Sequence, residues 1–236
     1  MIYNVKISDG NRDHIIDLIN EKRKIGNFTV VDIGGSIEGW SASVVNALVD
    51  FNEPIIKKDN IMHFKFDITH PDGWIEILEY VKINGKFDFC ICTHTLEDIM
   101  NPGYVCEQIS KISKEGYIAV PSKHCELSKF EAYFVFPNKF REGDSVKTEF
   151  VGHRGYIHHR WIFTVNNNEF IGFPKIGYID KAIIFDNVSD NSSEKSDLSF
   201  FWKDSVSVKY INNNYLGPCS WNVVSFYDNL LDPEYV

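Results

Sequence analysis

The sequence lacks the long apolar runs and the basic clusters that mark several classes of protein. None of its apolar stretches approaches the roughly 20 residues that a membrane-spanning helix needs. The first residues, Met1 to Lys6, have neither the basic region nor the apolar core of a signal peptide. The formal net charge is -9 and the basic residues are dispersed, which argues against binding to nucleic acid or to an anionic membrane. We therefore expect a cytoplasmic protein whose partner is a small molecule.

Two further absences concern metal and dinucleotide sites. The five cysteines are an odd number, and Cys90 and Cys92 have no second pair with which to complete a tetrahedral zinc site. The stretch from Gly34 to Gly39 reads Gly-Gly-Ser-Ile-Glu-Gly, which does not match the Gly-x-Gly-x-x-Gly fingerprint of dinucleotide-binding folds. A zinc knuckle is excluded, and a dinucleotide site is a weak hypothesis.

What is present is an alternation of strand and helix patterns in a chain of 236 residues, 44% of them hydrophobic. Apolar runs predict strands and period-3.6 patterns predict helices, in the order helix 9–24, strands 28–33, 44–50 and 61–68, helix 71–81, strand 87–93, helix 102–113 and strand 117–120. This alternation indicates an α/β fold with a Rossmann-like, doubly wound, mostly parallel sheet.

The rest of the chain is predicted to be rich in β-structure. Residues 161–165 and 169–173 flank three asparagines, a hairpin signal, and strands are expected at 200–202 and 205–211. We expect one domain over residues 1–236, with a cofactor-binding core at 28–122 and a β-rich substrate or cap region at 123–236. Whether this second region forms a lid or the surface of a homodimer stays open.

The motif that points to a ligand is the strand Thr29 to Ile33 with the glycines that follow it. Glycine has no Cβ, so Gly34 and Gly35 allow a sharp turn and a close approach of ligand atoms to the backbone. Asp32 adds a fixed negative charge at the end of this strand. An ordinary tight turn is the alternative reading of this motif.

Carboxylates follow the next two predicted strands. In a doubly wound sheet the ligand lies across the carboxyl ends of the strands, where Asp50 and Asp67 are expected. A carboxylate at the end of the second strand can accept both hydroxyl protons of a ribose, and one after the third can accept from an adenine amino group. The fourth strand ends in Thr93-His94-Thr95-Leu96-Glu97-Asp98.

In combination, these residues resemble the class I S-adenosylmethionine-dependent methyltransferases, in particular the small-molecule branch with a Ser/Thr-His-x-Leu-Glu pattern followed by Asn-Pro. The resemblance covers about 28–122. It implies a methyltransferase-like domain with S-adenosyl-L-methionine as the cofactor. The residues implied or predicted to bind the cofactor are Asp32, Gly34, Gly35, Ser36, Asp50, Asp67, Ile68 and Thr93.

One departure from the family pattern leaves two ways to assign strands and helices to the chain, which we call partitions. Between Gly35 and Val44 there is too little chain for a full crossover helix. If 39–51 is nevertheless that helix, Asp67 becomes the second-strand acid and Asp50 is merely solvated. We favour the partition with a strand at 44–50, because it supplies all five expected strands.

The second candidate site is the segment 153–160, which holds three histidines and two arginines. These residues could bind an anionic group, supply a general base or ligate a metal, and ordinary surface or core roles compete with each of these. We expect no metal, because no carboxylate lies at ligand spacing in this segment. The predicted catalytic residues are His94, His153 and His159, and the predicted substrate-binding residues are Arg154, Tyr156, His158 and Arg160.

The sequence therefore predicts a methyltransferase that moves a methyl group to a small polar acceptor. The predicted acceptor atom is an oxygen of a sugar or a phosphorylated metabolite, and the resemblance suggests surface-polysaccharide modification. The alternative is a noncatalytic Rossmann-like protein that binds a ligand or serves in assembly.

Overall fold

The computed structural model describes residues 1–52, 58–129, 133–137, 145–149, 153–177, 179–188 and 193–211. The strands are β1 (Ile2–Ser8), β2 (Val30–Ile33), β3 (Ala47–Asp50), β4 (Met62–Lys65), β5 (Phe87–Thr93), β6 (Ser113–Pro121), β7 (Tyr133–Pro137), β8 (Ser145–Glu149), β9 (Trp161–Asn166), β10 (Glu169–Pro174), β11 (Asp197–Lys203) and β12 (Val208–Tyr210). The α-helices are α1 (Asp13–Ile25), α2 (Ile75–Asn84), α3 (Pro102–Ile112) and α4 (Lys123–Leu127).

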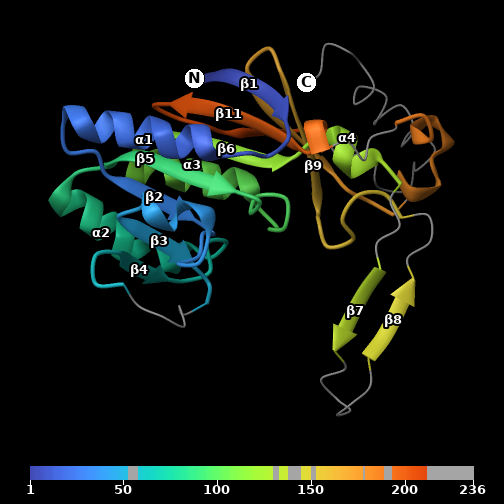
Figure 1. Cartoon of the computed structure of the whole chain (residues 1–236), viewed down its shortest axis with the longest axis horizontal. Helices are drawn as coiled ribbons and strands as arrows, with labels where there is room; N and C mark the ends of the chain where they lie inside the picture. The colour runs from blue at the N-terminus through green and yellow to red at the C-terminus, as the bar shows by residue number, and fades with distance from the viewer. Residues whose placement is uncertain are drawn as a thin grey trace.

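A seven-stranded sheet in the order β1-β11-β6-β5-β2-β3-β4 forms the centre of the molecule (Figure 1). The five strands from β6 to β4 are all parallel, while β11 runs antiparallel to both of its neighbours. Counted along the chain, these five parallel strands have the order 3-2-1-4-5 of a doubly wound Rossmann-like sheet. The predicted fold class is confirmed, and the strand order reverses between β2 and β5.

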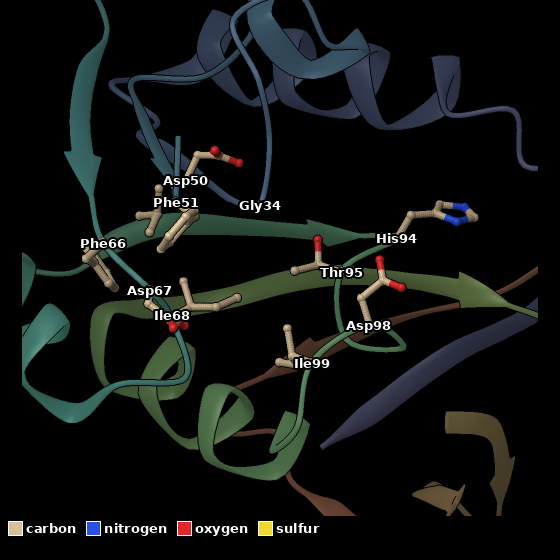
Figure 2. A pocket seen from close by; sticks show the side chains of 11 residues that line it. Gly34, Asp50, Phe51, Phe66, Asp67, Ile68, His94, Thr95, Asp98 and Ile99 are labelled. Atoms are coloured by element: carbon tan, nitrogen blue, oxygen red, sulfur yellow. The ribbon is translucent and has the colours of Figure 1, made fainter. Parts of the chain in front are cut away.

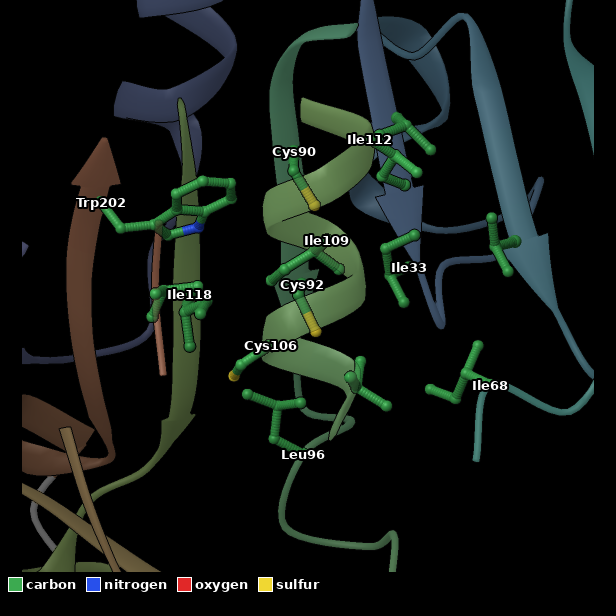
Figure 3. Close-up of a cluster of buried hydrophobic side chains, with 14 of the residues drawn as sticks. Ile33, Ile68, Cys90, Cys92, Leu96, Cys106, Ile109, Ile112, Ile118 and Trp202 are labelled. Carbon is green, nitrogen blue, oxygen red and sulfur yellow. The ribbon is translucent and has the colours of Figure 1, made fainter. Parts of the chain in front are cut away.

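Helices cover both faces of this sheet, as the alternation of side chains along buried strands requires. On one face, Val30 and Ile91 pack with Ile15 and Ile19 of α1. On the other face, helices α2 and α3 cover the sheet, and Figure 3 shows Cys90 and Cys92 of β5 beside Ile109 of α3. Buried thiols therefore serve here as small hydrophobes, and Cys90, Cys92, Cys106 and Cys125 are all free.

Local sequence signals set the ends of the helices. Helix α3 begins with Pro102 at its first position, directly after Asn101, whose side chain accepts a hydrogen bond from the Tyr104 amide. Helix α2 ends at Gly85, which has φ +84°, a conformation that suits glycine at a helix end. No described helix is both long enough and apolar enough to cross a bilayer.

The connection from β2 to β3 contains only a short 3-10 helix, Trp40–Ser43. The chain then enters β3 with its register fixed by Asn46, which donates its amide to the Val30 carbonyl and accepts from the Val30 amide through its side chain. The favoured partition is thus confirmed, with Asp50 as the last residue of β3, and the alternative of a helix over 39–51 is wrong.

The central sheet extends beyond the residues 28–122 that were predicted as the cofactor-binding core. Strands β1 and β11 lie outside that range, yet both belong to the central sheet. β11 pairs with β6 over its whole length, from Asp197 opposite Pro121 to Lys203 opposite Glu115. The region after residue 122 thus contributes one strand, β11, to the central sheet.

A smaller sheet with the order β12-β10-β9 confirms the predicted β-rich elaboration. β9 and β10 form the expected hairpin, and its two turn residues, Asn167 and Asn168, have φ of 49° and 60°. Positive φ at both turn positions is the geometry of a type I′ hairpin, which asparagine tolerates. Strands β7 and β8 form a separate antiparallel pair.

Candidate active site

A cleft of about 380 Å³ opens at the carboxyl ends of β2, β3 and β5 (Figure 2). This is the place where the strand order reverses, and ligands bind at such points in doubly wound sheets. The residues that line the cleft are Gly34, Val49, Asp50, Phe51, Phe66, Asp67, Ile68, His94, Thr95, Asp98 and Ile99.

Gly34 forms the floor of the cleft at the end of β2. Its φ is +79°, and its amide donates to the Val49 carbonyl at 2.8 Å. A Cβ added at this position would lie 2.3 Å from Thr95 Oγ1, a contact that real Cβ atoms do not make. Both the backbone conformation and the neighbouring side chain therefore require glycine here, and the backbone is left bare toward the cleft.

Asp32 lies beneath this turn rather than in the cleft. It is buried, accepts a hydrogen bond from the Ser41 hydroxyl, and would be 2.1 Å from a Cβ on Gly35. Burial raises the pKa of its carboxyl group to about 7, although the Ser41 hydrogen bond opposes the shift. Asp32, Gly35, Ser36 and Thr93 are not among the residues that line the cleft, so of the predicted cofactor residues only Gly34, Asp50, Asp67 and Ile68 are brought to it.

The two carboxylates predicted for the cofactor hold their own local turns. Asp50 accepts from the Asn52 amide at 2.6 Å. Asp67 accepts from the hydroxyl and the amide of Thr69, and these bonds lower the pKa of its carboxyl group. The lining also includes Phe51, Phe66, Ile68 and Ile99, which give the cleft an apolar wall.

His94 lies at the other edge of the cleft, where its ring points away from Asp50 (Figure 2). Its Nε2 is 3.0 Å from Asp197 Oδ2 and its Nδ1 is 3.4 Å from Glu97 Oε1. Burial alone would lower the pKa of the imidazole, but the two carboxylates outweigh it and raise the pKa to about 9. At neutral pH the ring is a cation with both nitrogens facing carboxylates, so this geometry does not suit the predicted role of His94 as a general base.

Arg154 is buried, with an exposed fraction of 1%, and its guanidinium lies in a shell of main-chain oxygens. It donates to the carbonyls of Leu127, Ile179, Ala182 and Phe185 and to the Asp186 carboxylate. The prediction that Arg154 binds substrate is wrong, because its donors are used to hold this loop together.

His153 does not reach the cleft either. Its Nδ1 is 2.8 Å from Asp180 Oδ2, in the same loop that Arg154 holds, and His153 is not among the residues that line the cleft. The structure thus separates His153 and Arg154 from the remainder of the 153–160 segment.

The second half of that segment does reach the cleft, through Asp98. His158 Nε2 and His159 Nε2 are each 3.8 Å from Asp98 Oδ1. His159 is buried, and its Nδ1 is 2.6 Å from Glu126 Oε1, whose other oxygen pairs with Lys175. The ring of Tyr156 lies 4.8 Å from that of His159, centroid to centroid.

Main-chain contacts fix this segment against the loop after β5. The Arg160 amide donates to the Glu97 carbonyl at 2.7 Å, and Arg160 Nε donates to the Asp98 carbonyl at 3.0 Å. Trp161 Nε1 donates to the Ile99 carbonyl at 2.9 Å. Two stretches about 60 residues apart in the sequence are thus held side by side at one edge of the cleft.

Several residues of this site carry no local signal in the sequence. Glu126, Lys175, Asp197 and Arg12 come from four separate segments, and only the fold brings them to His159 and His94. Asp98 differs, since it directly follows the Thr-His-x-Leu-Glu pattern of the fourth predicted strand. A carboxylate at that place could have been paired with the histidine segment as a hypothesis.

No protein-family model matches the sequence, and no curated protein matches it. The chain is similar to several solved structures. One is the N-terminal domain of EvdMO1, crystallised in the presence of SAH and D-fucose. The two sequences are 11% identical, the match covers 82% of this chain and 84% of that one, and the TM-score is 0.39. A second is an S-adenosylmethionine dependent methyltransferase from Mesorhizobium loti, with 11% identity, coverage of 78% and 95%, and a TM-score of 0.39.

A third is magnesium protoporphyrin IX methyltransferase (ChlM) from Synechocystis PCC 6803 with bound SAM, with 8% identity, coverage of 80% and 76%, and a TM-score of 0.36. These likenesses are distant. The strand order and strand directions of this chain define its fold.

Proposed function

We propose that this protein is an S-adenosylmethionine-dependent methyltransferase. The observation that carries the proposal is the cleft at the strand-order reversal, with bare backbone at Gly34, a carboxylate at the end of β3 and an apolar wall beyond it. These three features suit, in that order, a methionine chain, a ribose and an adenine. The sequence resemblance assigns the same residues to the same parts of the cofactor.

Different residues of the cleft contact different parts of the cofactor. The Asp50 carboxylate accepts hydrogen bonds from ribose hydroxyls, which a neutral side chain does less well. Phe51, Phe66 and Ile68 pack against the adenine ring, and Asp67 accepts from its amino group. When bound, S-adenosylmethionine supplies an electrophilic methyl group on a sulfonium. The protein then has to align the acceptor with that methyl group and exclude competing water.

For the acceptor we propose an oxygen of a sugar or of a phosphorylated metabolite. The polar edge of the cleft, with Asp98 in the lining and Arg160 beside it, offers one acceptor group and one cation to such a molecule. A new carbon–oxygen bond forms as the carbon–sulfur bond breaks, S-adenosylhomocysteine leaves, and the proton of the acceptor hydroxyl passes to solvent water. Surface-polysaccharide modification is the setting that the sequence resemblance suggests, and only an acceptor screen tests it.

Titration calorimetry with S-adenosylhomocysteine tests the cofactor. We expect micromolar binding by the wild-type chain, at least about tenfold weaker binding by Asp50→Asn, and no measurable binding by Gly34→Ala, whose methyl group meets Thr95. Asp59→Asn is the matched control, because it removes an exposed acid that does not line the cleft and leaves binding unchanged. A folded wild-type chain without binding overturns the proposal.

The second candidate function is a noncatalytic protein that keeps the cleft for ligand binding. The involvement of His94 in ion pairs favours it, since a predicted base is removed from the chemistry. The two functions differ in turnover. Formation of S-adenosylhomocysteine from S-adenosylmethionine, measured against a panel of sugars and sugar phosphates, supports the enzyme, whereas binding without turnover across the panel supports the second candidate.

A further inference from the structure

We propose that Asp98, His158 and His159 form a binding site for one divalent transition-metal ion at the edge of the cleft. Each of these residues offers one ligand atom, and the three atoms all lie within 4.8 Å of one another. The expectation of no metal rested on the lack of a carboxylate near the histidines in the sequence. The fold supplies that carboxylate from the loop after β5, about 60 residues away.

The spacing of the three ligands suits a site that closes around an ion. Asp98 Oδ1 is 3.8 Å from His158 Nε2 and 3.8 Å from His159 Nε2. Ligand bonds of about 2.0–2.2 Å at tetrahedral angles need donor atoms about 3.3–3.5 Å apart, so each of these two contacts has to shorten by a few tenths of an ångström. The two histidine ligand atoms, which lie within 4.8 Å of each other, have to approach each other as well. The side chains of His158 and Asp98 are 57% and 42% exposed, so small rotations of these two can provide that movement.

His159 is the fixed member of the set. Its side chain is 6% exposed, and its Nδ1 is bonded to Glu126 Oε1 at 2.6 Å, which turns Nε2 toward Asp98 and His158. A histidine that ligates a metal through one nitrogen commonly donates from the other to a carboxylate, which fixes its tautomer and orientation. Glu126 is in turn held by Lys175, so this outer partner is itself anchored in the interior.

The frame around the three ligands is tied by backbone contacts. The His159 amide donates to the Tyr156 carbonyl, and the next residue donates its amide to the Glu97 carbonyl, directly before Asp98. The segment that carries the two histidines is therefore fixed relative to the segment that carries the carboxylate. Binding of an ion therefore costs little conformational entropy beyond that of fixing two exposed side chains.

The ligand set selects the class of ion. Two imidazoles and one carboxylate suit Zn²⁺, Fe²⁺, Co²⁺ or Mn²⁺, whereas Mg²⁺ and Ca²⁺ prefer oxygen ligands. Three protein ligands leave at least one coordination position open, as catalytic metal sites do and structural ones do not. Because Asp98 also lines the cleft, that open position lies at the edge where an acceptor enters.

The role of the ion rests on the proposed function. A cation at this place binds a hydroxyl group of the acceptor, lowers its pKa and lets its proton pass to solvent water. The acceptor oxygen then attacks the methyl carbon without a general base from the protein. This accounts for a site in which His94 is paired with carboxylates and His159 faces two other ligands.

Metal binding is tested with the full chain after dialysis against a chelator, by titration with Zn²⁺ in a calorimeter and with Co²⁺ in a visible spectrometer. We expect one ion per chain, and a visible absorption spectrum typical of a Co²⁺ ion with a low coordination number. His158→Ala and Asp98→Asn, both at exposed positions, should bind at least about 100-fold more weakly, and Glu126→Gln about 10–100-fold more weakly. His70→Ala is the matched control, since it removes an exposed histidine elsewhere and leaves binding unchanged.

The same preparations are titrated with S-adenosylhomocysteine, so that the two proposals are separated. Zn²⁺ binding without S-adenosylhomocysteine binding supports the metal site and overturns the methyltransferase. S-adenosylhomocysteine binding by a chain that takes up no ion overturns the metal site alone. Equal ion affinity in His158→Ala and His70→Ala also overturns it, because the ion then binds elsewhere.

Discussion

The two edges of the cleft are held in place in different ways. At the edge formed by Gly34, Asp50 and Asp67, which we call the cofactor edge, the polar side chains bond to residues only two positions away. At the edge formed by His94, Asp98 and the histidine segment, which we call the acceptor edge, the bonds join parts of the chain 33 to 103 residues apart.

Because of this difference, we expect substitutions at the two edges to affect ligand binding and protein stability differently. A change at the cofactor edge disturbs one short turn, so its effect should fall on the ligand and not on the fold. A change at the acceptor edge removes a link between distant segments, so it should lower the free energy of unfolding as well. Three substitutions follow, from the largest expected effect on stability to the smallest: Arg154 lies outside both edges but also links distant segments, and the other two substitutions lie one at each edge.

Arg154→Ala should have the largest effect on stability. It removes a buried cation and all of its hydrogen bonds, to four carbonyl groups and to the Asp186 carboxylate, and Asp186 then keeps only its pairing with Lys129 among these charges. We expect a loss of about 3–5 kcal/mol in the free energy of unfolding, measured by urea denaturation. Arg160→Ala, which removes an exposed arginine six positions along, should lower the free energy of unfolding by less than about 1 kcal/mol. Equal losses in the two variants would contradict the assignment of Arg154 as the structural residue.

His94→Gln should remove a pH-dependent part of the stability. The pKa of His94 is raised in the folded protein, so its ion pairs stabilise the fold fully below the ordinary histidine pKa of about 6.5 and are lost as pH rises through about 9. Because the side chain is 41% exposed, solvent screening limits the contribution to about 1 kcal/mol. Urea unfolding of wild type and variant at pH 6.5 and pH 10 measures it. The variants should differ at pH 6.5 and converge at pH 10, and a constant difference argues against the ion pairs.

Asp67→Asn should have the smallest effect on stability. Asp67 is exposed and its carboxylate accepts from Thr69, two positions along, and asparagine can cap the same turn. We expect a change below about 0.5 kcal/mol in the free energy of unfolding, together with several-fold weaker binding of S-adenosylhomocysteine. Thermal unfolding and calorimetry on one preparation give both numbers. A large loss of stability would remove the contrast between the two edges.

The same contrast explains what the sequence could predict. The strands from β2 to β6, the hairpin of β9 and β10, and the place of Asp50 at the end of β3 follow from local patterns: apolar runs, glycines, and asparagines in a turn. Gly34 was found because the feature that matters, the lack of a Cβ, is visible in the residue itself. Each of these predictions depends on neighbours in the sequence.

The acceptor edge depends on distance in space and was mostly missed. His158 and His159 were noted in the sequence, but the carboxylates beside them, Asp98 and Glu126, are 60 and 33 positions away from them. Arg154 was misassigned for the same reason, because nothing near it in the sequence reveals that it is buried among carbonyl groups. Strand β1 was not predicted, although Tyr3, Val5 and Ile7 alternate with the more exposed Asn4 and Lys6 as a strand pattern does.

The position of β1 has a consequence for synthesis on the ribosome. Among the described strands β1 pairs with β11 alone, and the two strands are about 190 residues apart in the chain. At a translation rate of about 5–20 residues per second, β1 is made roughly 10–40 s before its partner. During that interval the five parallel strands can assemble while the edge of β6 stays open, so a nascent chain depends on chaperones or on its own solubility until β11 emerges and closes the sheet.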